Sequence, residues 1–185
     1  MLRGVNLYLI GMMGSGKSTV GRILAEELKY QFFDSDQLIE QVSKQSVAQI
    51  FDAQGEAAFR ILETEVLSKL APYTRLVIST GGGAVLKPEN WSYLHHGVVV
   101  WLDVAPETLF QRIKKDPRRP LLQTADPLQT LKNLLEQRQR FYSQADVRVE
   151  VSTETPVRKV ALQVLESVKA RIEQDAPNRA QFYGR

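Results

Sequence analysis

The feature that most constrains the fold is a glycine-rich motif near the N-terminus, Gly-Met-Met-Gly-Ser-Gly-Lys-Ser at residues 11–18. It has the spacing of a phosphate-binding loop, which is a glycine, four variable residues and then Gly-Lys-Ser or Gly-Lys-Thr. An apolar run at residues 5–10 precedes it, and a stretch with helical periodicity at residues 17–28 follows it. Strand, loop and helix in this order predict a nucleoside triphosphate site at the end of a buried strand.

Each residue type in this motif has a role in binding phosphate. Glycines let the backbone turn tightly so that consecutive N–H groups face the anion, and the N-terminus of the following helix adds partial positive charge. We expect Lys17 to neutralise the β and γ oxygens and the Ser18 hydroxyl to ligate Mg²⁺. A glycine-rich turn with a surface lysine is the alternative, and the flanking strand and helix disfavour it.

Short apolar runs alternate with helical stretches along the whole chain. The runs are residues 5–10, 31–33, 76–79, 98–102 and 147–151. The predicted helices are residues 17–28, 36–42, 47–53, 56–70, 88–94, 106–114, 128–142 and 156–173. This alternation predicts a three-layer α/β/α fold, in which helices cover both faces of a central five-stranded parallel sheet. A length of 185 residues suits one such domain.

Composition narrows the chemistry and the partners. The chain has no cysteine, which excludes disulfides, thiolate zinc sites and cysteine nucleophiles and agrees with a reducing compartment. A net charge of +3 is too small to indicate a nucleic-acid partner. The first apolar run is too short to span a membrane and lacks a signal-peptide cleavage pattern. We therefore expect a cytoplasmic protein without nucleic-acid or membrane partners, or a protein of the plastid stroma if a transit peptide was removed. We also expect a monomer, although no single feature of the composition indicates the oligomeric state.

The ends of the second and third predicted strands carry candidate acceptor residues. Asp34 and Asp36 follow the second strand, and their carboxylates could serve a metal and a hydroxyl, although either could instead cap the next helix. The third strand ends in three glycines at residues 81–83, where many P-loop ATPases carry an acidic metal ligand. We therefore expect Asp34 to serve the metal, and the glycines to let a ligand approach the backbone closely. A flexible turn is the alternative for the glycines.

Further motifs follow in a fixed order. They are Phe-Phe-Asp-Ser-Asp at residues 32–36, Phe59-Arg60 after Gly55-Glu56, Ser-Thr-Gly-Gly-Gly at 79–83, Arg-Pro-Leu-Leu at 119–122, and Arg138 four residues before Tyr142. With the phosphate loop, this set resembles the shikimate kinase family from about residue 6 to about residue 173. The resemblance implies transfer of the γ-phosphate of ATP to the 3-hydroxyl of shikimate. The products would be shikimate 3-phosphate and ADP, on the pathway to chorismate and aromatic amino acids, with Mg²⁺ as cofactor.

The resemblance also implies a role for each matching residue. Lys17, Asp36 and Arg119 would be catalytic, with Asp36 receiving the proton of the attacking hydroxyl and Arg119 folding over the phosphoryl group. The shikimate-binding residues would be Asp36, Arg60, Gly81, Gly82, Gly83 and Arg138, with the two arginines gripping the carboxylate. The ATP-binding residues would be Gly14, Ser15, Gly16, Lys17, Ser18, Thr19, Arg112, Arg119 and Pro156, with Arg112 and Pro156 on either side of adenine. Ser18 would bind the metal directly and Asp34 through water.

Within a single P-loop kinase domain over residues 1–185, the resemblance and the pattern together indicate four parts. They are a phosphate loop at 11–19, a helical shikimate-binding subregion at about 34–62, a mobile lid at about 113–126, and a polar tail at 175–185 that we expect to fray. Without the resemblance, a helical arginine such as Arg60 or Arg138 is more often a solvated charge, and Arg119 could belong to a plain surface loop.

Three other functions remain open from the residues alone. A gluconate kinase or another small-molecule P-loop kinase would share the phosphate loop. A nucleoside monophosphate kinase would also share it, but the glycine triplet and the short lid fit such an enzyme poorly. A non-catalytic nucleotide-binding switch would need no acceptor residues, and the acidic pair and the arginines argue against it.

Overall fold

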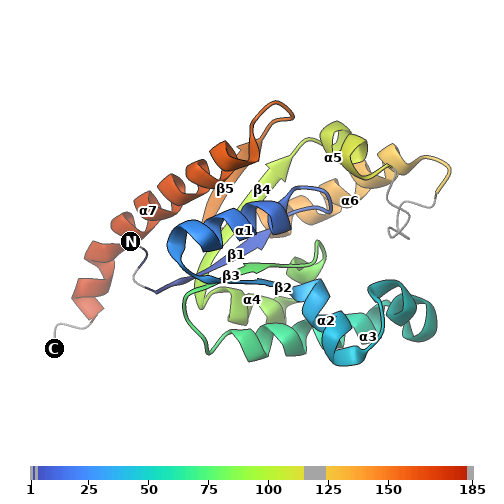
Figure 1. The fold of residues 1–185 in the computed structure, drawn as a ribbon, viewed down its shortest axis with the longest axis horizontal. Helices are drawn as coiled ribbons and strands as arrows, with labels where there is room; N and C mark the ends of the chain where they lie inside the picture. Colours follow the sequence, from blue (N-terminus) through green and yellow to red (C-terminus); the bar gives the residue numbers. More distant parts are fainter. Residues whose placement is uncertain (1, 3, 115–123, 183–185) are drawn as a thin grey trace.

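The computed structural model describes residue 2, residues 4–114 and residues 124–182. They fold around a five-stranded sheet with the order β2-β3-β1-β4-β5 (Figure 1). The strands are β1 (Asn6–Ile10), β2 (Gln31–Asp34), β3 (Leu76–Ser79), β4 (Gly97–Val104) and β5 (Val147–Val151). All neighbouring pairs are parallel, so the carboxyl ends of the strands meet at one edge. The predicted α/β class and parallel five-stranded sheet are confirmed.

Burial follows position in the sheet. The inner strands β1 and β3 are buried along their whole length, as expected for parallel strands with helices on both faces, and this explains their continuous apolar sequence. The edge strand β5 instead alternates between buried valines and exposed Arg148 and Glu150. Charged side chains on an edge strand discourage pairing with another chain.

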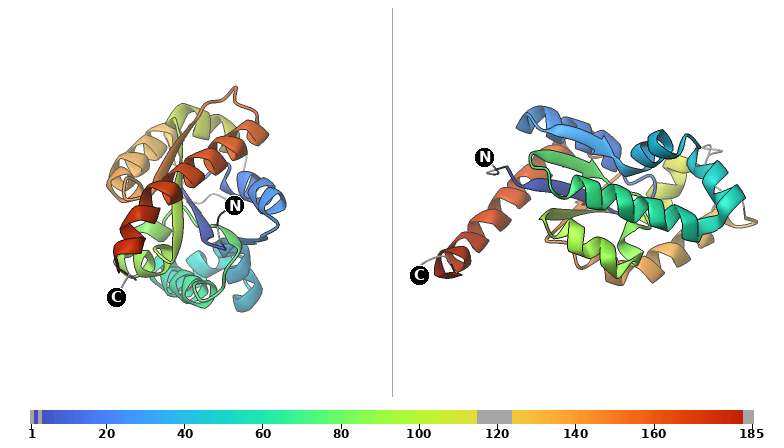
Figure 2. Two further views of the ribbon diagram at one scale, coloured as in Figure 1. Left: turned by 90° about the vertical axis from the view of Figure 1, so that its left-hand side faces the viewer. Right: turned by 90° about the horizontal axis from the view of Figure 1, so that it is seen from below.

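Helices cover both faces of the sheet. They are α1 (Lys17–Leu28), α2 (Ser35–Ser43), α3 (Val47–Leu70), α4 (Pro88–Leu94), α5 (Pro106–Ile113), α6 (Pro127–Tyr142) and α7 (Val157–Phe182), with a short 3₁₀ helix η1 (Ala84–Leu86). Helices α1 and α7 contact each other on one face, and α3, α4 and α6 lie on the other (Figure 2). This arrangement gives the expected three layers. None of the described helices combines the length and the apolar character needed to cross a bilayer.

One expected helix boundary is confirmed, and two other local features differ from the prediction. The helices expected at residues 47–53 and 56–70 make up α3, which is divided at Gly55 by a non-helical backbone (φ 80°, ψ 174°), inside the predicted gap. The 3₁₀ helix η1 was not predicted, because a single turn leaves no periodicity. Helix α7 continues to Phe182, through most of the tail that we expected to fray. The predicted lid connects α5 to α6, which contact each other, and its central residues 115–123 lie outside the described part.

Candidate active site

The phosphate loop connects β1 to α1 and depends on glycine at three positions. Gly11, Gly14 and Gly16 have φ values of 137°, 77° and 93°, a range that side chains rarely tolerate. Space is also lacking at two of them. A Cβ atom on Gly11 would lie 2.7 Å from the carbonyl oxygen of Leu102, and one on Gly14 would lie 2.6 Å from Cγ2 of Ile113. The loop is therefore packed directly against β4 and α5.

Lys17 is held inside this loop. Its side chain is buried, with 8% of the residue exposed. The Nζ atom donates hydrogen bonds to the carbonyl oxygens of Gly11 (2.8 Å) and Met12 (2.9 Å) and lies 3.4 Å from Oγ of Ser15. These contacts fix the ammonium group where the loop curves, which is the position from which a lysine can neutralise a bound phosphate.

Ser18 and Asp34 form the candidate metal site. The Ser18 hydroxyl donates to Oδ2 of Asp34 at 2.6 Å and lies 3.2 Å from Oγ of Ser79. The other oxygen of Asp34, Oδ1, accepts from the backbone N–H groups of Asp36 (3.1 Å) and Gln37 (3.3 Å) and so caps α2. The capping alternative is thus correct for Asp34, whose other oxygen remains bonded to Ser18.

This pair suits Mg²⁺, which prefers oxygen ligands and keeps several waters and substrate phosphates around it. Across the described ranges, no three side chains of His, Cys, Asp or Glu cluster closely enough to hold a metal ion. The Ser18 hydroxyl and the Asp34 carboxylate supply oxygen donors of this kind side by side.

A cavity of about 860 Å³ lies beside the phosphate loop. Every predicted ATP-binding residue that the structure describes lines it, namely Gly14, Ser15, Gly16, Lys17, Ser18, Thr19, Arg112 and Pro156. Arg112 reaches the loop itself, since its Nη1 donates to the carbonyl oxygen of Gly14 at 3.2 Å. Arg119 lies outside the described residues. The cavity also includes Asp36 and Gly82, which belong to the predicted acceptor side.

Asp36 and Glu63 both lie against Gly81, where the backbone has no room for a side chain. A Cβ atom on Gly81 would lie 2.8 Å from Oδ1 of Asp36 and 2.7 Å from Oε1 of Glu63. The Gly81 N–H donates to Oγ of Ser35 at 3.0 Å, which fixes the start of the glycine triplet against α2. Glycine is needed at this position so that two carboxylates can approach the same peptide.

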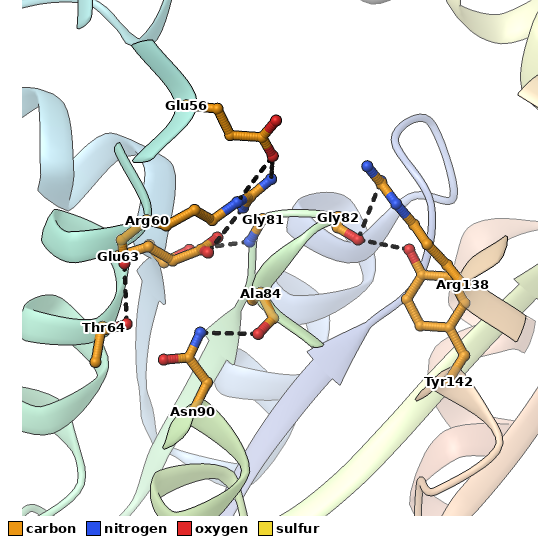
Figure 3. Close-up of polar contacts among 11 residues, drawn as sticks. Glu56, Arg60, Glu63, Thr64, Gly81, Gly82, Ala84, Asn90, Arg138 and Tyr142 are labelled. Atoms are coloured by element: carbon orange, nitrogen blue, oxygen red, sulfur yellow. Dashed lines mark hydrogen bonds and ion pairs between the residues drawn. The ribbon is translucent and has the colours of Figure 1, made fainter. Parts of the chain in front are cut away.

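Arg60 approaches the triplet from α3 and is held by two acids (Figure 3). Its Nη1 lies 2.8 Å from Oε2 of Glu63, and its Nη2 lies 2.9 Å from Oε1 of Glu56. Only 11% of the Arg60 side chain is exposed. A Cβ atom on Gly83 would overlap the guanidinium group. The alternative of a solvated charge is therefore wrong for Arg60.

Glu63 was not among the predicted site residues. Its side chain is fully buried, and burial raises the pKa of its carboxyl group, whereas Arg60 lowers it and Asp36 raises it further. A sequence signal did exist: a glutamate one helical turn after Arg60, on a helix face that is otherwise apolar, needs a partner to be buried. That signal becomes clear only once the buried face of α3 is known.

Arg138 and Tyr142 approach the triplet from α6, opposite Arg60 (Figure 3). Both donate to the carbonyl oxygen of Gly82, Arg138 through Nη1 at 3.3 Å and Tyr142 through its hydroxyl at 2.6 Å. Arg138 is also buried, with 6% exposed, so the solvated-charge alternative is wrong here too. Two guanidinium groups from different helices therefore flank one glycine-rich turn, an arrangement suited to a small carboxylate.

Comparisons with known proteins agree on one family. The family model described as shikimate kinase matches residues 13–169. The shikimate kinase of Synechococcus sp. (strain JA-3-3Ab) is 58% identical over 177 residues, which cover 95% of this chain and 94% of that protein. The solved structure of shikimate kinase from Acinetobacter baumannii in complex with shikimate has a TM-score of 0.88 and 39% identity, covering 91% of this chain and 95% of that one.

A gluconokinase structure bears on the rival function. The enzyme from Sinorhizobium meliloti 1021 covers 96% of this chain and 98% of its own, with a TM-score of 0.59 and 19% identity. At that level of identity the similarity establishes a common fold and does not extend to the substrate.

Proposed function

The chain belongs to the shikimate kinase family, and we propose that it transfers the γ-phosphate of ATP to the 3-hydroxyl of shikimate with the residues described above. One observation carries the assignment of roles. Asp36 lines the same cavity as Lys17 and also lies against Gly81, the first glycine of the turn that Arg60 and Arg138 flank. The donor and acceptor sites therefore meet at this carboxylate.

On the donor side, the loop N–H groups and Lys17 bind the β- and γ-phosphates. Mg²⁺ would be held by the Ser18 hydroxyl and, through water, by Asp34, and it supplies charge neutralisation at the phosphate oxygens. Arg112 and Pro156 also line the cavity, where they would enclose adenine.

On the acceptor side, Arg60 and Arg138 bind the carboxylate of shikimate from opposite sides of the glycine turn. Glu63 keeps the Arg60 guanidinium in place through its 2.8 Å ion pair. Asp36 orients the 3-hydroxyl and accepts its proton while the new oxygen–phosphorus bond forms and the bond from the γ-phosphorus to the bridging oxygen of ADP breaks.

Closure over the two substrates completes the site. We assign this to the lid at about 113–126 and, within it, to Arg119, which would stabilise charge on the transferring group. A closed site excludes water, so the γ-phosphate passes to the sugar acid instead of being hydrolysed. The single-domain organisation, the monomeric state and the cytoplasmic location stay predictions.

A coupled assay of ADP release tests the proposal. We expect turnover with ATP and shikimate, little turnover with gluconate, and little without an acceptor. Changing Lys17→Met should lower kcat by at least about a hundredfold while circular dichroism shows an intact fold, because the variant loses a preorganised positive charge at the phosphate.

Two outcomes would contradict the proposed function. Turnover with gluconate equal to that with shikimate would favour the rival small-molecule kinase. Nucleotide binding without transfer to either acceptor would favour the non-catalytic switch.

A further inference from the structure

The carbonyl oxygen of Gly82 receives an unusual share of the hydrogen bonds around the site. Tyr142 and Arg138, one helical turn apart on α6, both donate to it. The sulfur of Met12, a residue of the phosphate loop, lies 3.5 Å from the Tyr142 hydroxyl and 4.0 Å from the Arg138 guanidinium. The side chains of Tyr142 and Arg138 thus connect α6 to both the glycine turn and the phosphate loop.

We propose that Tyr142 is a positioning residue for the acceptor, whose hydroxyl fixes the peptide plane between Gly82 and Gly83. The inference rests on the proposed function, because it specifies how the glycine floor of the shikimate site is kept in its binding orientation. It assigns Tyr142 no contact with either substrate.

The geometry of the peptide bond carries the argument. The described chain has no cis peptide bonds, so the carbonyl of Gly82 and the N–H of Gly83 point in opposite directions. Since the carbonyl of Gly82 points to α6, the N–H of Gly83 points away from α6. Arg60 approaches the triplet from the side opposite Arg138 (Figure 3). No described residue accepts a hydrogen bond from this N–H. It is therefore a donor aimed at the space between the two arginines.

Three consecutive glycines cannot keep this orientation by themselves. Glycine lacks the Cβ atom that restricts other residues, so its peptide planes rotate at little cost. An external restraint is needed, and a 2.6 Å hydrogen bond from a buried phenol provides one. Without it, the Gly83 N–H would sample directions that do not face the acceptor.

Tyr142 is better suited to this task than Arg138. The Arg138 bond to Gly82 is longer, at 3.3 Å, and that guanidinium also has a carboxylate to bind. Tyr142 is fully buried, and its ring stacks on Trp101 with centroids 5.7 Å apart. Burial also raises the pKa of Tyr142 to about 12, so the hydroxyl keeps its proton at neutral pH. It remains a donor to Gly82 while Arg138 turns to the substrate.

The test compares Tyr142→Phe with wild type by steady-state kinetics and calorimetry. The variant keeps the ring and its stacking and removes only the hydroxyl. We expect the Kd and KM for shikimate to rise about five- to thirtyfold, which is the scale of a lost buried hydrogen bond. The Kd for ATP should change less than twofold, and kcat should fall less than KM rises.

Tyr8→Phe is the matched control. Tyr8 is equally buried, but its ring lies beside Gly97 at the amino end of β4, whereas the glycine turn follows the carboxyl end of the parallel strand β3. Removal of the Tyr8 hydroxyl should leave the Kd for shikimate unchanged.

An unchanged Kd for shikimate in Tyr142→Phe would overturn the proposal. So would equal losses of shikimate and ATP affinity, or a variant that does not fold, because these results would assign the hydroxyl to general stability. Failure of the proposed function would look different, since wild type itself would then not phosphorylate shikimate.

Discussion

Glu63 shows how a single buried carboxylate connects stability to the site. It lies against Gly81 together with Asp36, and its charge is offset by Arg60. Because burial raises its pKa above the ordinary value of 4.5, the folded chain holds this proton more tightly than the unfolded chain does. Between the two pKa values the native state binds more protons, so stability falls as pH rises.

A comparison with Glu63→Gln, whose side chain does not titrate, should reveal this loss of stability with rising pH. The free energy of unfolding of wild type, minus that of the variant, should be largest below pH 4.5 and should decrease as the pH rises through the raised pKa. Urea denaturation at a series of pH values measures it. A difference that stays constant or increases with pH would show that the pKa of Glu63 is not raised by folding.

Arg60 offers a second test at the scale of one side chain. Its guanidinium is buried against Gly83 and held by Glu56 and Glu63, so it is preorganised for an anion. Arg60→Ala should weaken shikimate binding at least about tenfold, the scale of a lost charged hydrogen bond, while ATP binding changes less than twofold. Calorimetric titration with each ligand measures both affinities.

Arg148→Ala is the matched control for this change. Arg148 is also paired with two acids, Asp103 at 2.6 Å and Glu150 at 3.3 Å, but it lies on the edge strand β5. Arg148→Ala should change the affinity for neither shikimate nor ATP. Equal losses of shikimate and ATP affinity in Arg60→Ala would reject it as a carboxylate ligand.

At the scale of elements, the break in α3 is the feature with the clearest energetic consequence. Gly55 has φ 80° and ψ 174°, a region open essentially to glycine alone, yet a Cβ atom there would meet no atom within 4 Å. A side chain at position 55 would therefore destabilise the chain through backbone strain and not through steric overlap. The residues after the break include Glu56 and Arg60, which lie on the proposed acceptor side.

Gly55→Ala should accordingly lower the free energy of unfolding by about 1–3 kcal/mol, the usual cost of a strained backbone conformation. Urea denaturation would measure this. Gln54→Ala, at the preceding and exposed position, should change stability by less than about 0.5 kcal/mol. If Gly55→Ala is as stable as wild type, α3 can rearrange around the break without cost.

The elements also show what the sequence could and could not predict. Local signals sufficed for β1, the phosphate loop and α1, because glycine spacing and periodicity act within a few residues. The ion pair of Glu63 with Arg60 and the shared carbonyl of Gly82 depend on which helix faces meet, and no local pattern contains that information. The capping of α2 by Asp34 was one of two open readings, and the structure combines capping with the contact to Ser18.

At the scale of the whole molecule, the nucleotide cavity takes its walls from segments far apart in the chain. The phosphate loop, α2, α5 and the connection from β5 to α7 all contribute. Such a cavity exists only in the folded chain, so a ligand bound there stabilises the native state by mass action.

A non-hydrolysable ATP analogue with Mg²⁺, at about a hundred times its Kd, should add about 2.7 kcal/mol to stability. For a domain of this size that is a rise in Tm of about 5–10 °C, measurable by scanning calorimetry. The Lys17→Met variant should show little of this ligand-induced increase in Tm. A shift that persists in this variant would place the nucleotide away from the phosphate loop.

The strand order gives the phosphate loop more resistance to local opening than the segment that carries Asp34 and Asp36. The phosphate loop extends from β1, which pairs with β3 on one side and β4 on the other, whereas β2, which leads to Asp34 and Asp36, pairs with β3 alone among the described strands. Detaching an edge strand breaks fewer contacts than extracting a central one, so amide hydrogens near β2 should exchange with solvent sooner than those of β1. Opening at β2 should then disturb Asp34 and Asp36 while the phosphate loop, which extends from the central strand β1, keeps its structure.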